Sequence, residues 1–181
     1  MLSPDRRRVW LLAGALACFS SAIAAFEPPS GTLTPTSDPI VAQGGPYLVS
    51  NPSGAATGDP VCDGEGAICD HFDLTLDLPA SFRQANPNLA IRFQLDTDSP
   101  SGADDLDLYI RDAQTGELLG ASATASADEA SQILLTDLPD QIRVDVVPFA
   151  VAGATTTLTI GFVQGQAGAP ADPCAIGSDT S

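Results

Sequence analysis

The fold of this chain is decided by the stretch Phe72-Asp73-Leu74-Thr75-Leu76-Asp77-Leu78-Pro79. Apolar and polar residues alternate at every position, and a proline ends the run. Because successive side chains of a β-strand point to opposite faces, strict alternation places one face against a core and the other in solvent. Such half-buried strands are typical of antiparallel sheets. The stretch therefore predicts an antiparallel strand at the surface of a β-domain.

The same alternation recurs through the middle of the chain. It is strong in residues 89–95, 105–111, 142–147 and 157–162, and weaker in residues 118–124 and 132–136. No apolar pattern of helical period continues for three turns, and residues 80–86 have room for one helical turn at most. Several short strands separated by Gly, Pro and Asp turns indicate a sandwich or barrel. We predict an all-β fold, an antiparallel jelly-roll-like β-sandwich.

The two ends of the chain lack this alternation. Residues 26–60 are rich in Pro, Gly, Ser and Thr, with some strand character at 40–50, and predict a disordered or extended lead-in. Residues 165–181 predict a disordered tail. Residues 61–164 lie between them and are enough for one hydrophobic core but not for two. We therefore expect a single sandwich domain at 61–164.

The first 25 residues have the order of a secretory signal peptide. Arg6-Arg7-Arg8 precedes the apolar run Val9–Ala17, and small residues lead to Ala22-Ile23-Ala24-Ala25. The apolar run is shorter than the ~20 residues needed to span a bilayer. We expect cleavage after Ala24 or Ala25, which predicts a secreted or periplasmic protein without a transmembrane segment in the mature chain.

Two variants of this export signal stay open. Arg6-Arg7-Arg8-Val9-Trp10 loosely fits a twin-arginine signal, although a generic basic region explains it as well. Ala15-Leu16-Ala17-Cys18 resembles a lipoprotein cleavage box, in which Cys18 would carry a lipid anchor. The box normally has Leu where Ala15 stands. Lipid anchoring through Cys18 is therefore the minor alternative.

The mature chain is strongly acidic. Without residues 1–25 it has four arginines, no lysine and 22 acidic residues, which gives a net charge of 4 − 22 = −18. Such a surface repels phosphate backbones and anionic lipids and attracts cations, including Ca²⁺. Nucleic acid is therefore excluded as an expected partner.

Cysteine spacing predicts one disulfide. Cys62 and Cys69 are close enough in an exported chain to close a small loop, which stabilises a fold by roughly 2–3 kcal/mol. The alternative is a metal site, but His71 is the sole histidine that could accompany the cysteines. We therefore predict a Cys62–Cys69 disulfide, and Cys174 has no predicted partner.

Three segments resemble the bacterial pre-peptidase C-terminal domain family. They are residues 69–79, 104–112 and 142–148, and the strongest element is Asp105-x-Asp107-Leu108-Tyr109-x-x-Asp112. The resemblance covers roughly residues 61–164. It implies a β-sandwich module of exported proteins that assists secretion or maturation or holds substrate for a neighbouring enzyme. It also implies calcium in some members. This sequence departs from the usual arrangement in having no enzyme domain beside the module.

One acidic cluster suggests a calcium site. Its members are Asp96, Asp98, Asp104, Asp105 and Asp107. If the strands at 89–95 and 105–111 pair as a hairpin, these carboxylates meet at one end of it, where like charges are destabilising. Ca²⁺ accepts six to eight oxygen ligands in flexible geometry, whereas Zn²⁺ prefers His or Cys. We predict that the cluster binds Ca²⁺; the alternative is that the acids are solvated, or that the loop crosses between sheets and separates them.

No catalytic motif is recognisable in the sequence. His71 has no Gly-x-Ser-x-Gly elbow to partner it, and no phosphate-binding or dinucleotide-binding glycine pattern occurs. We therefore predict a non-enzymatic accessory or binding module with a protein or polysaccharide ligand. For a polysaccharide, Tyr47 and Tyr109 are the stacking candidates. The alternatives are a secreted, glycosidase-like hydrolase that uses a carboxylate pair, and a cell-envelope adhesive or structural protein.

Overall fold

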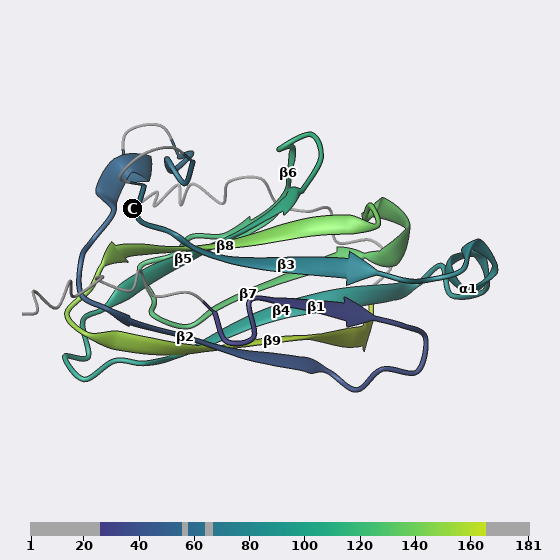
Figure 1. The fold of residues 1–181 in the computed structure, drawn as a ribbon, viewed down its shortest axis with the longest axis horizontal. Coiled ribbons are helices and arrows are strands. Elements are labelled where there is room, and N and C mark those ends of the chain that lie inside the picture. The colour runs from purple at the N-terminus through teal and green to yellow at the C-terminus, as the bar shows by residue number, and fades with distance from the viewer. Residues whose placement is uncertain (1–25, 56–57, 64–66, 166–181) are drawn as a thin grey trace, which may run out of the picture.

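The computed structural model describes residues 26–55, 58–63 and 67–165. Two β-sheets pack face to face in it (Figure 1). The five-stranded sheet has the order β1-β3-β8-β5-β6, and the four-stranded sheet has the order β2-β9-β4-β7. The prediction of an all-β sandwich is confirmed. The predicted export signal at 1–25, all of the predicted tail except Gly165, Cys18 and Cys174 lie outside the described residues.

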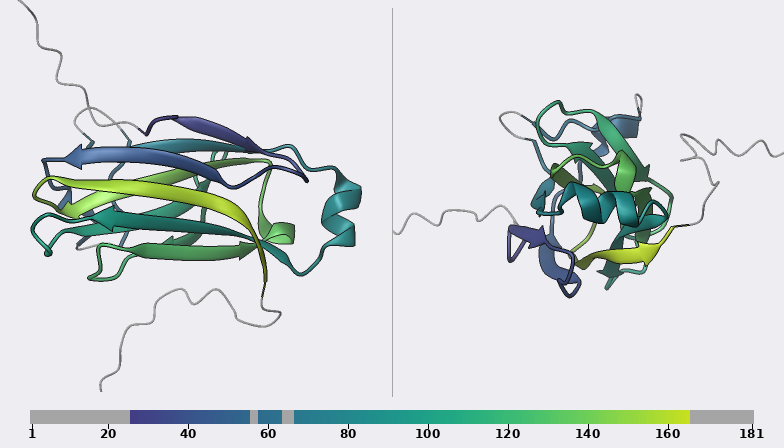
Figure 2. Two further views of the ribbon diagram at one scale, coloured as in Figure 1. Left: turned by 90° about the horizontal axis from the view of Figure 1, so that it is seen from below. Right: turned by 90° about the vertical axis from the view of Figure 1, so that its right-hand side faces the viewer.

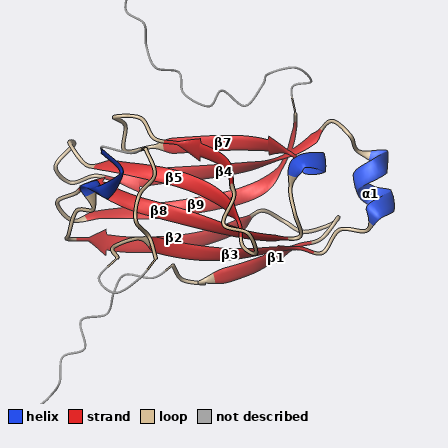
Figure 3. Ribbon diagram, turned by 90° about the horizontal axis from the view of Figure 1, so that it is seen from above, coloured by secondary structure: helices blue, strands red, loops and turns tan. Residues whose placement is uncertain are grey.

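The strands follow the alternating segments of the sequence closely. Their bounds are β1 Ser30–Leu33, β2 Ile40–Tyr47, β3 Asp70–Leu76, β4 Leu89–Asp98, β5 Asp105–Asp112, β6 Leu118–Ser122, β7 Glu129–Leu134, β8 Gln141–Ala150 and β9 Ala154–Gln164. Three short helices complete the order: η1 Pro52–Ala55, α1 Ala80–Ala85 and η2 Leu135–Asp137. The single helical turn expected at 80–86 is α1, which lies at one end of the sandwich (Figure 3).

Strands β2 to β9 have the strand order of a jelly roll. The four-stranded sheet, in the order β2-β9-β4-β7, faces the strands β3-β8-β5-β6 of the other sheet (Figure 2). Consecutive strands of the chain therefore cross repeatedly between the two layers. These strands pair antiparallel throughout. Strand β1 is added beside β3 in parallel orientation. This topology places the loops between strands at the two ends of the sandwich.

The core forms where the period of two places it. On β3, Phe72, Leu74 and Leu76 are buried between the sheets, and Phe93 and Leu95 of β4 meet them from the other layer. The polar residues between them alternate to the outer faces, as the pattern of a half-buried strand requires. The alternation in the sequence therefore predicted both the strands and their inward faces.

The domain begins earlier than the sequence predicted. The segment 26–60, expected to be a lead-in, supplies β1 and β2, and its residues Phe26 and Leu33 belong to the core. Glycines hide the strand pattern of β2. A Cβ on Gly44 would lie 2.4 Å from the Tyr47 hydroxyl oxygen, so this position needs a glycine for close packing. The sandwich therefore includes residues of the segment 26–60 and is not confined to 61–164.

None of the helices in the described ranges has the length and hydrophobicity to span a membrane. The longest, α1, covers six residues. Its Phe82 packs on Phe162 of β9 with ring centroids 6.0 Å apart. The helix therefore closes one end of the core.

Candidate functional site

The acidic residues predicted to share a calcium ion are divided between the two sheets. Strand β4 belongs to the four-stranded sheet and β5 to the five-stranded sheet, so the expected hairpin is wrong. Strand β4 pairs instead with β7 and β9, and β5 pairs with β6 and β8. Residues 99–104 cross from one layer to the other. The loop thus separates the cluster.

Three of the five aspartates are solvated or already bonded within the protein. Asp96 is exposed and accepts a hydrogen bond of 2.9 Å from Gln94 Nε2, and Asp98 is exposed at the end of β4. Asp104 is buried and accepts hydrogen bonds from the hydroxyls of Ser99 and Ser101 at 2.6 and 2.8 Å. These two bonds hold the pKa of Asp104 below its usual range. None of the three needs a cation to satisfy its charge.

The other two aspartates are held in a less favourable setting. Asp105 Oδ1 is buried and has no hydrogen-bond partner. Asp107 is 8% exposed, and burial, followed by the neighbouring Asp105 and Glu129, raises its pKa to about 7. Burial and Glu129 also raise the pKa of Asp105. Part of the predicted cluster is therefore a group of electrostatically coupled carboxylates.

Glu129 is the member of this group that the sequence did not reveal. It lies on β7, opposite Leu95 of β4, and its buried carboxylate accepts hydrogen bonds from Ser122 and from Thr124. At the edge of the sandwich, β7 lies near β5, which brings Glu129 close to Asp107. Because the two residues are far apart in the sequence, no local sequence motif predicts that they are neighbours. Within residues 26–55, 58–63 and 67–165, no three Asp, Glu, His or Cys side chains stand in an arrangement that could hold one metal ion.

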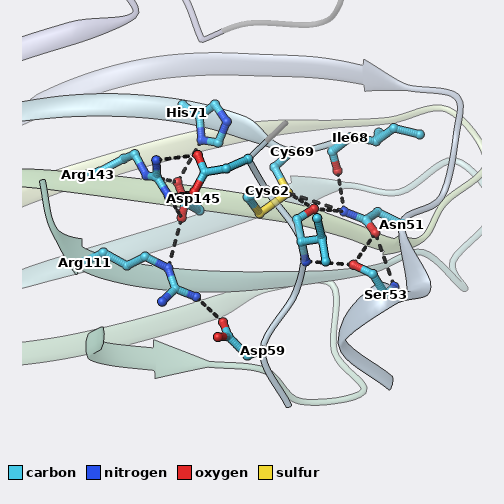
Figure 4. Close-up of a disulfide and its surroundings, with 12 residues drawn as sticks. Asn51, Ser53, Asp59, Cys62, Ile68, Cys69, His71, Arg111, Arg143 and Asp145 are labelled. Atoms are coloured by element: carbon cyan, nitrogen blue, oxygen red, sulfur yellow. Dashed lines mark hydrogen bonds and ion pairs between the residues drawn. A yellow bond between two sulfur atoms is a disulfide. The ribbon is translucent and has the colours of Figure 1, made fainter. Parts of the chain in front are cut away.

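A second polar cluster surrounds Asp145 on the outer face of the five-stranded sheet (Figure 4). The Asp145 side chain is fully buried. Its Oδ1 lies 2.7 Å from His71 Nδ1 and 2.9 Å from Arg143 Nε, and its Oδ2 lies 3.3 Å from Arg111 Nε. Strands β3, β8 and β5 are neighbours in the sheet, so they place these residues side by side. One buried carboxylate therefore joins three cationic or ionisable side chains.

Further acids extend this cluster to the surface. Asp59 pairs with Arg111, and Asp63 accepts a hydrogen bond of 2.8 Å from Arg143 Nη1. The Asp145 hydrogen bond raises the pKa of His71 above its usual value. Among the described residues, His71 has no hydrogen bond to a hydroxyl that could serve as a nucleophile. The cluster therefore has the charge pattern of a structural ion network.

The disulfide predicted between Cys62 and Cys69 is present, with the two Cα atoms 5.3 Å apart. Both cysteines are buried against Tyr109 and Val147, outside the main core. The segment before the disulfide is held by Asn51, whose Nδ2 donates to the carbonyls of residues 61 and 68 at 3.2 and 2.9 Å. The described parts of this segment, residues 48–55, 58–63 and 67–69, are thus held on the outer face of the five-stranded sheet.

This fixed segment exposes large apolar side chains. Leu48 is 74% exposed, Val49 57% and Val61 58%. Leu48 and Val49 directly follow β2, and the hydrogen bond from Asn51 to the Val61 carbonyl joins the two parts of the segment. We call Leu48, Val49 and Val61 the apolar patch. The sequence did not reveal the patch, because Leu48 and Val49 fall in the predicted lead-in at 26–60, whereas Val61 was assigned to the sandwich domain.

The aromatic residues considered for sugar stacking are not at the surface. Tyr47 is buried between the sheets, and Tyr109 is buried beneath the disulfide segment. Because a stacking platform must present a ring face to solvent, neither residue serves as one in this arrangement. The hypothesis of polysaccharide binding therefore no longer has a candidate stacking residue in Tyr47 or Tyr109.

Comparison with known proteins adds no functional residue to this geometry. No protein-family model matches the chain, and no curated protein matches it. The candidate sites therefore rest on the contacts described above: the apolar patch, the ion network of Asp145 and the coupled carboxylates of Asp105, Asp107 and Glu129.

Proposed function

We propose that this chain is an exported, non-catalytic accessory module that binds a protein ligand through its apolar patch. One observation carries the proposal: Leu48, Val49 and Val61 expose more than half of their surface on a segment that is fixed by covalent and polar contacts. Large apolar side chains held together at a surface are typical of protein interaction sites.

The fixed conformation of the segment favours binding. The Cys62–Cys69 disulfide and the hydrogen bonds from Asn51 to the carbonyls of Val61 and Ile68 order this part of the surface before any ligand arrives. A preorganised surface loses less conformational entropy on association, so more of its contact energy becomes affinity. A protein ligand suits this patch better than a polysaccharide, since its side chains are aliphatic and both candidate tyrosines are buried.

Export is supported by two independent features. The order of basic, apolar and small residues before Phe26 is that of a signal peptide. The disulfide is of the kind that persists in oxidising compartments. The resemblance to pre-peptidase C-terminal domains supports an accessory role, with the module acting on secretion, maturation or substrate holding of an exported partner.

The non-catalytic assignment rests on how the ionisable groups are used. Asp145 is occupied by His71, Arg143 and Arg111, so the carboxylate that would orient a general base also neutralises two arginines. A general base without an aligned nucleophile does not make a hydrolytic site. We therefore assign this cluster to holding β3, β8 and β5 together.

Calcium binding is the second proposed property, with a different set of ligands from the one the sequence predicted. Asp105 Oδ1 is buried without a partner, and the charge of this residue interacts with the buried carboxylates of Asp107 and Glu129. A depression of about 510 Å³ opens at Asp105 between the 99–104 and 125–127 loops. We propose that Ca²⁺ entering there draws the three carboxylates together, because its flexible coordination accepts mixed carboxylate and carbonyl oxygens.

A capture experiment tests the accessory role. Mature protein is immobilised and exposed to culture supernatant of the native host, beside a variant with Leu48→Ser, Val49→Ser and Val61→Ser. The proposal expects an exported protein that the wild type retains and the triple variant loses. The matched control is Val41→Ser, a 51% exposed valine on β2 outside the patch. Equal capture by wild type and triple variant would contradict the proposal.

A further inference from the structure

The backbone nitrogen of Phe26 faces a buried carboxylate. It donates a hydrogen bond of 2.8 Å to Asp70 Oδ1. The Phe26 side chain is 1% exposed and packs edge-to-face on Phe72, with ring centroids 6.2 Å apart. Residue 26 is therefore anchored in the core by its side chain and by its nitrogen at once.

Asp70 is a charged residue in an apolar setting. It is 2% exposed at the inward face of β3, and its Oδ2 accepts a hydrogen bond of 2.9 Å from the Tyr47 hydroxyl. Burial raises its pKa to about 6. In the described residues its carboxylate forms no ion pair with an arginine or histidine. Buried carboxylates are normally paired with a cation, so Asp70 lacks the partner that its position calls for.

The sequence supplies a cation at this place. The stretch Ala22-Ile23-Ala24-Ala25, rich in small residues, ends the predicted signal peptide directly before Phe26, and cleavage after Ala25 would create an α-amino group at Phe26. We propose that the export signal is cleaved at the Ala25–Phe26 bond and that the resulting α-ammonium group of Phe26 forms a buried ion pair with Asp70. This inference rests on the proposed export of the chain.

The chemistry of the step is an ordinary hydrolysis. A signal peptidase adds water across the Ala25–Phe26 peptide bond: the carbonyl carbon of Ala25 gains the oxygen and becomes a carboxylate, and the nitrogen of Phe26 gains protons and becomes an ammonium. The neutral N–H that faces Asp70 is replaced by a charged donor at the same atom. Charge-assisted hydrogen bonds are roughly twice as strong as neutral ones.

The first residues of the mature chain are already held in place for this pair. Glu27 exchanges two backbone hydrogen bonds with Gln43 of β2, at 2.8 and 2.9 Å. Chain termini usually fray unless they are tied down. Because the Phe26 side chain and the following residue Glu27 are both fixed, the ammonium stays at Asp70, and cleavage couples export to the final stability of the fold.

The absence of lysine makes the experiment selective. After cleavage the α-amino group is the sole primary amine of the chain, so amine-reactive reagents report on it alone. Protein exported by the native host is first measured as an intact mass, which is expected to correspond to a chain beginning at Phe26. A mass beginning at Ala25 would overturn the assigned cleavage site, whereas retention of the whole chain in the cytoplasm would instead refute export itself.

The ion pair is then tested by labelling with a succinimidyl ester at pH 8. Pairing raises the pKa of the amine and hides it, so the native protein is expected to react at least about tenfold more slowly than the urea-unfolded protein. Asp70→Asn, which keeps the size of the side chain, is expected to raise the labelling rate of the folded protein most of the way to the rate of the unfolded protein, while Asp73→Asn on the outer face of β3 leaves it slow. A native wild-type rate equal to the unfolded rate would overturn the ion pair, whatever the variants do.

Discussion

His71 Nδ1 lies 2.7 Å from Asp145 Oδ1, across a register in which the two residues are direct partners on β3 and β8. The imidazole is partly exposed, while the carboxylate is fully buried. The hydrogen bond that His71 makes to the Asp145 carboxylate raises the pKa of His71, and burial of the imidazole lowers this pKa by a smaller amount. The folded protein therefore favours the protonated imidazole more strongly than the unfolded chain does.

The pKa of His71 can be measured directly, because it is the sole histidine. We expect an NMR titration of its ring to give a pKa above the usual value of about 6.5, and Asp145→Asn to lower it. Since the folded pKa is raised, the stabilisation from this pair is complete below pH ~6.5 and is lost as the pH rises through the folded pKa. A titration at or below 6.5 in the wild type would refute this ion pair.

The disulfide is expected to stabilise the fold modestly. Replacing Cys62 and Cys69 by serine should lower the free energy of unfolding by roughly 2–3 kcal/mol, because it restores the freedom of a short loop. Denaturant unfolding of the double variant measures the loss. Non-reducing peptide mapping of the exported wild type should link Cys62 to Cys69; a linkage of either residue to Cys174 would contradict the pairing seen here.

Asp107 should lower the free energy of unfolding as the pH rises, whereas a carboxylate paired with a cation raises it. Its folded pKa is raised to about 7, so its contribution to stability falls as the pH rises from about 4 to about 7. Asp107→Asn removes this pH-dependent loss of stability, because asparagine does not ionise. In chelator, the variant should exceed the wild type in free energy of unfolding by at least about 1 kcal/mol at pH 7.5, and by less at pH 4. A difference that does not change with pH would show that Asp107 titrates normally.

Calcium should raise the melting temperature if Asp105, Asp107 and Glu129 bind it. At a hundred times its dissociation constant, a ligand stabilises folding by about 2.7 kcal/mol, which for this domain is a shift of roughly 10 °C. Asp105→Asn combined with Asp107→Asn should abolish the shift. Because binding requires ionised carboxylates, the shift should grow between pH 6 and pH 8.

Two controls define the calcium ligands. Asp96→Asn with Asp98→Asn should leave the shift intact, since both side chains are exposed to solvent and do not belong to the proposed site. Asp77→Asn, an exposed acid after β3, controls for net charge. Magnesium should act much more weakly, because it demands octahedral geometry and gives up its water reluctantly. A melt that is identical in millimolar calcium and in excess chelator would remove the proposed site.

The sequence predicted the fold well where local pattern and tertiary structure agree. Strands β3, β4, β5, β8 and β9 have the period of two, so their existence and inward faces follow from side-chain geometry alone. Strand β2 breaks this agreement, because Gly44 and Gly45 interrupt the pattern for reasons of tertiary packing. Gly44 makes room for Tyr47 and Asp70, and Gly45 has a φ of 87°.

The candidate sites were predicted less well, because they depend on which strands become neighbours. The jelly-roll order sends β4 and β5 to different sheets, so Asp96 and Asp107 are separated although they are close in sequence. The same order brings Glu129 near Asp107 and His71 beside Asp145, which are far apart in the chain. The spacing of these residues along the sequence predicts neither pair. The Cys62–Cys69 pair was predictable because only six residues lie between the two cysteines.

The binding role depends on the apolar patch, and affinity for the captured protein tests it most directly. Truncating a central contact residue typically costs more than 1 kcal/mol of binding free energy. Leu48→Ala should therefore raise the dissociation constant at least about fivefold, with an unchanged melting temperature, because Leu48 is 74% exposed. Val41→Ala, on β2 outside the patch, should change it less than about twofold. Equal affinities for wild type and Leu48→Ala would contradict the account.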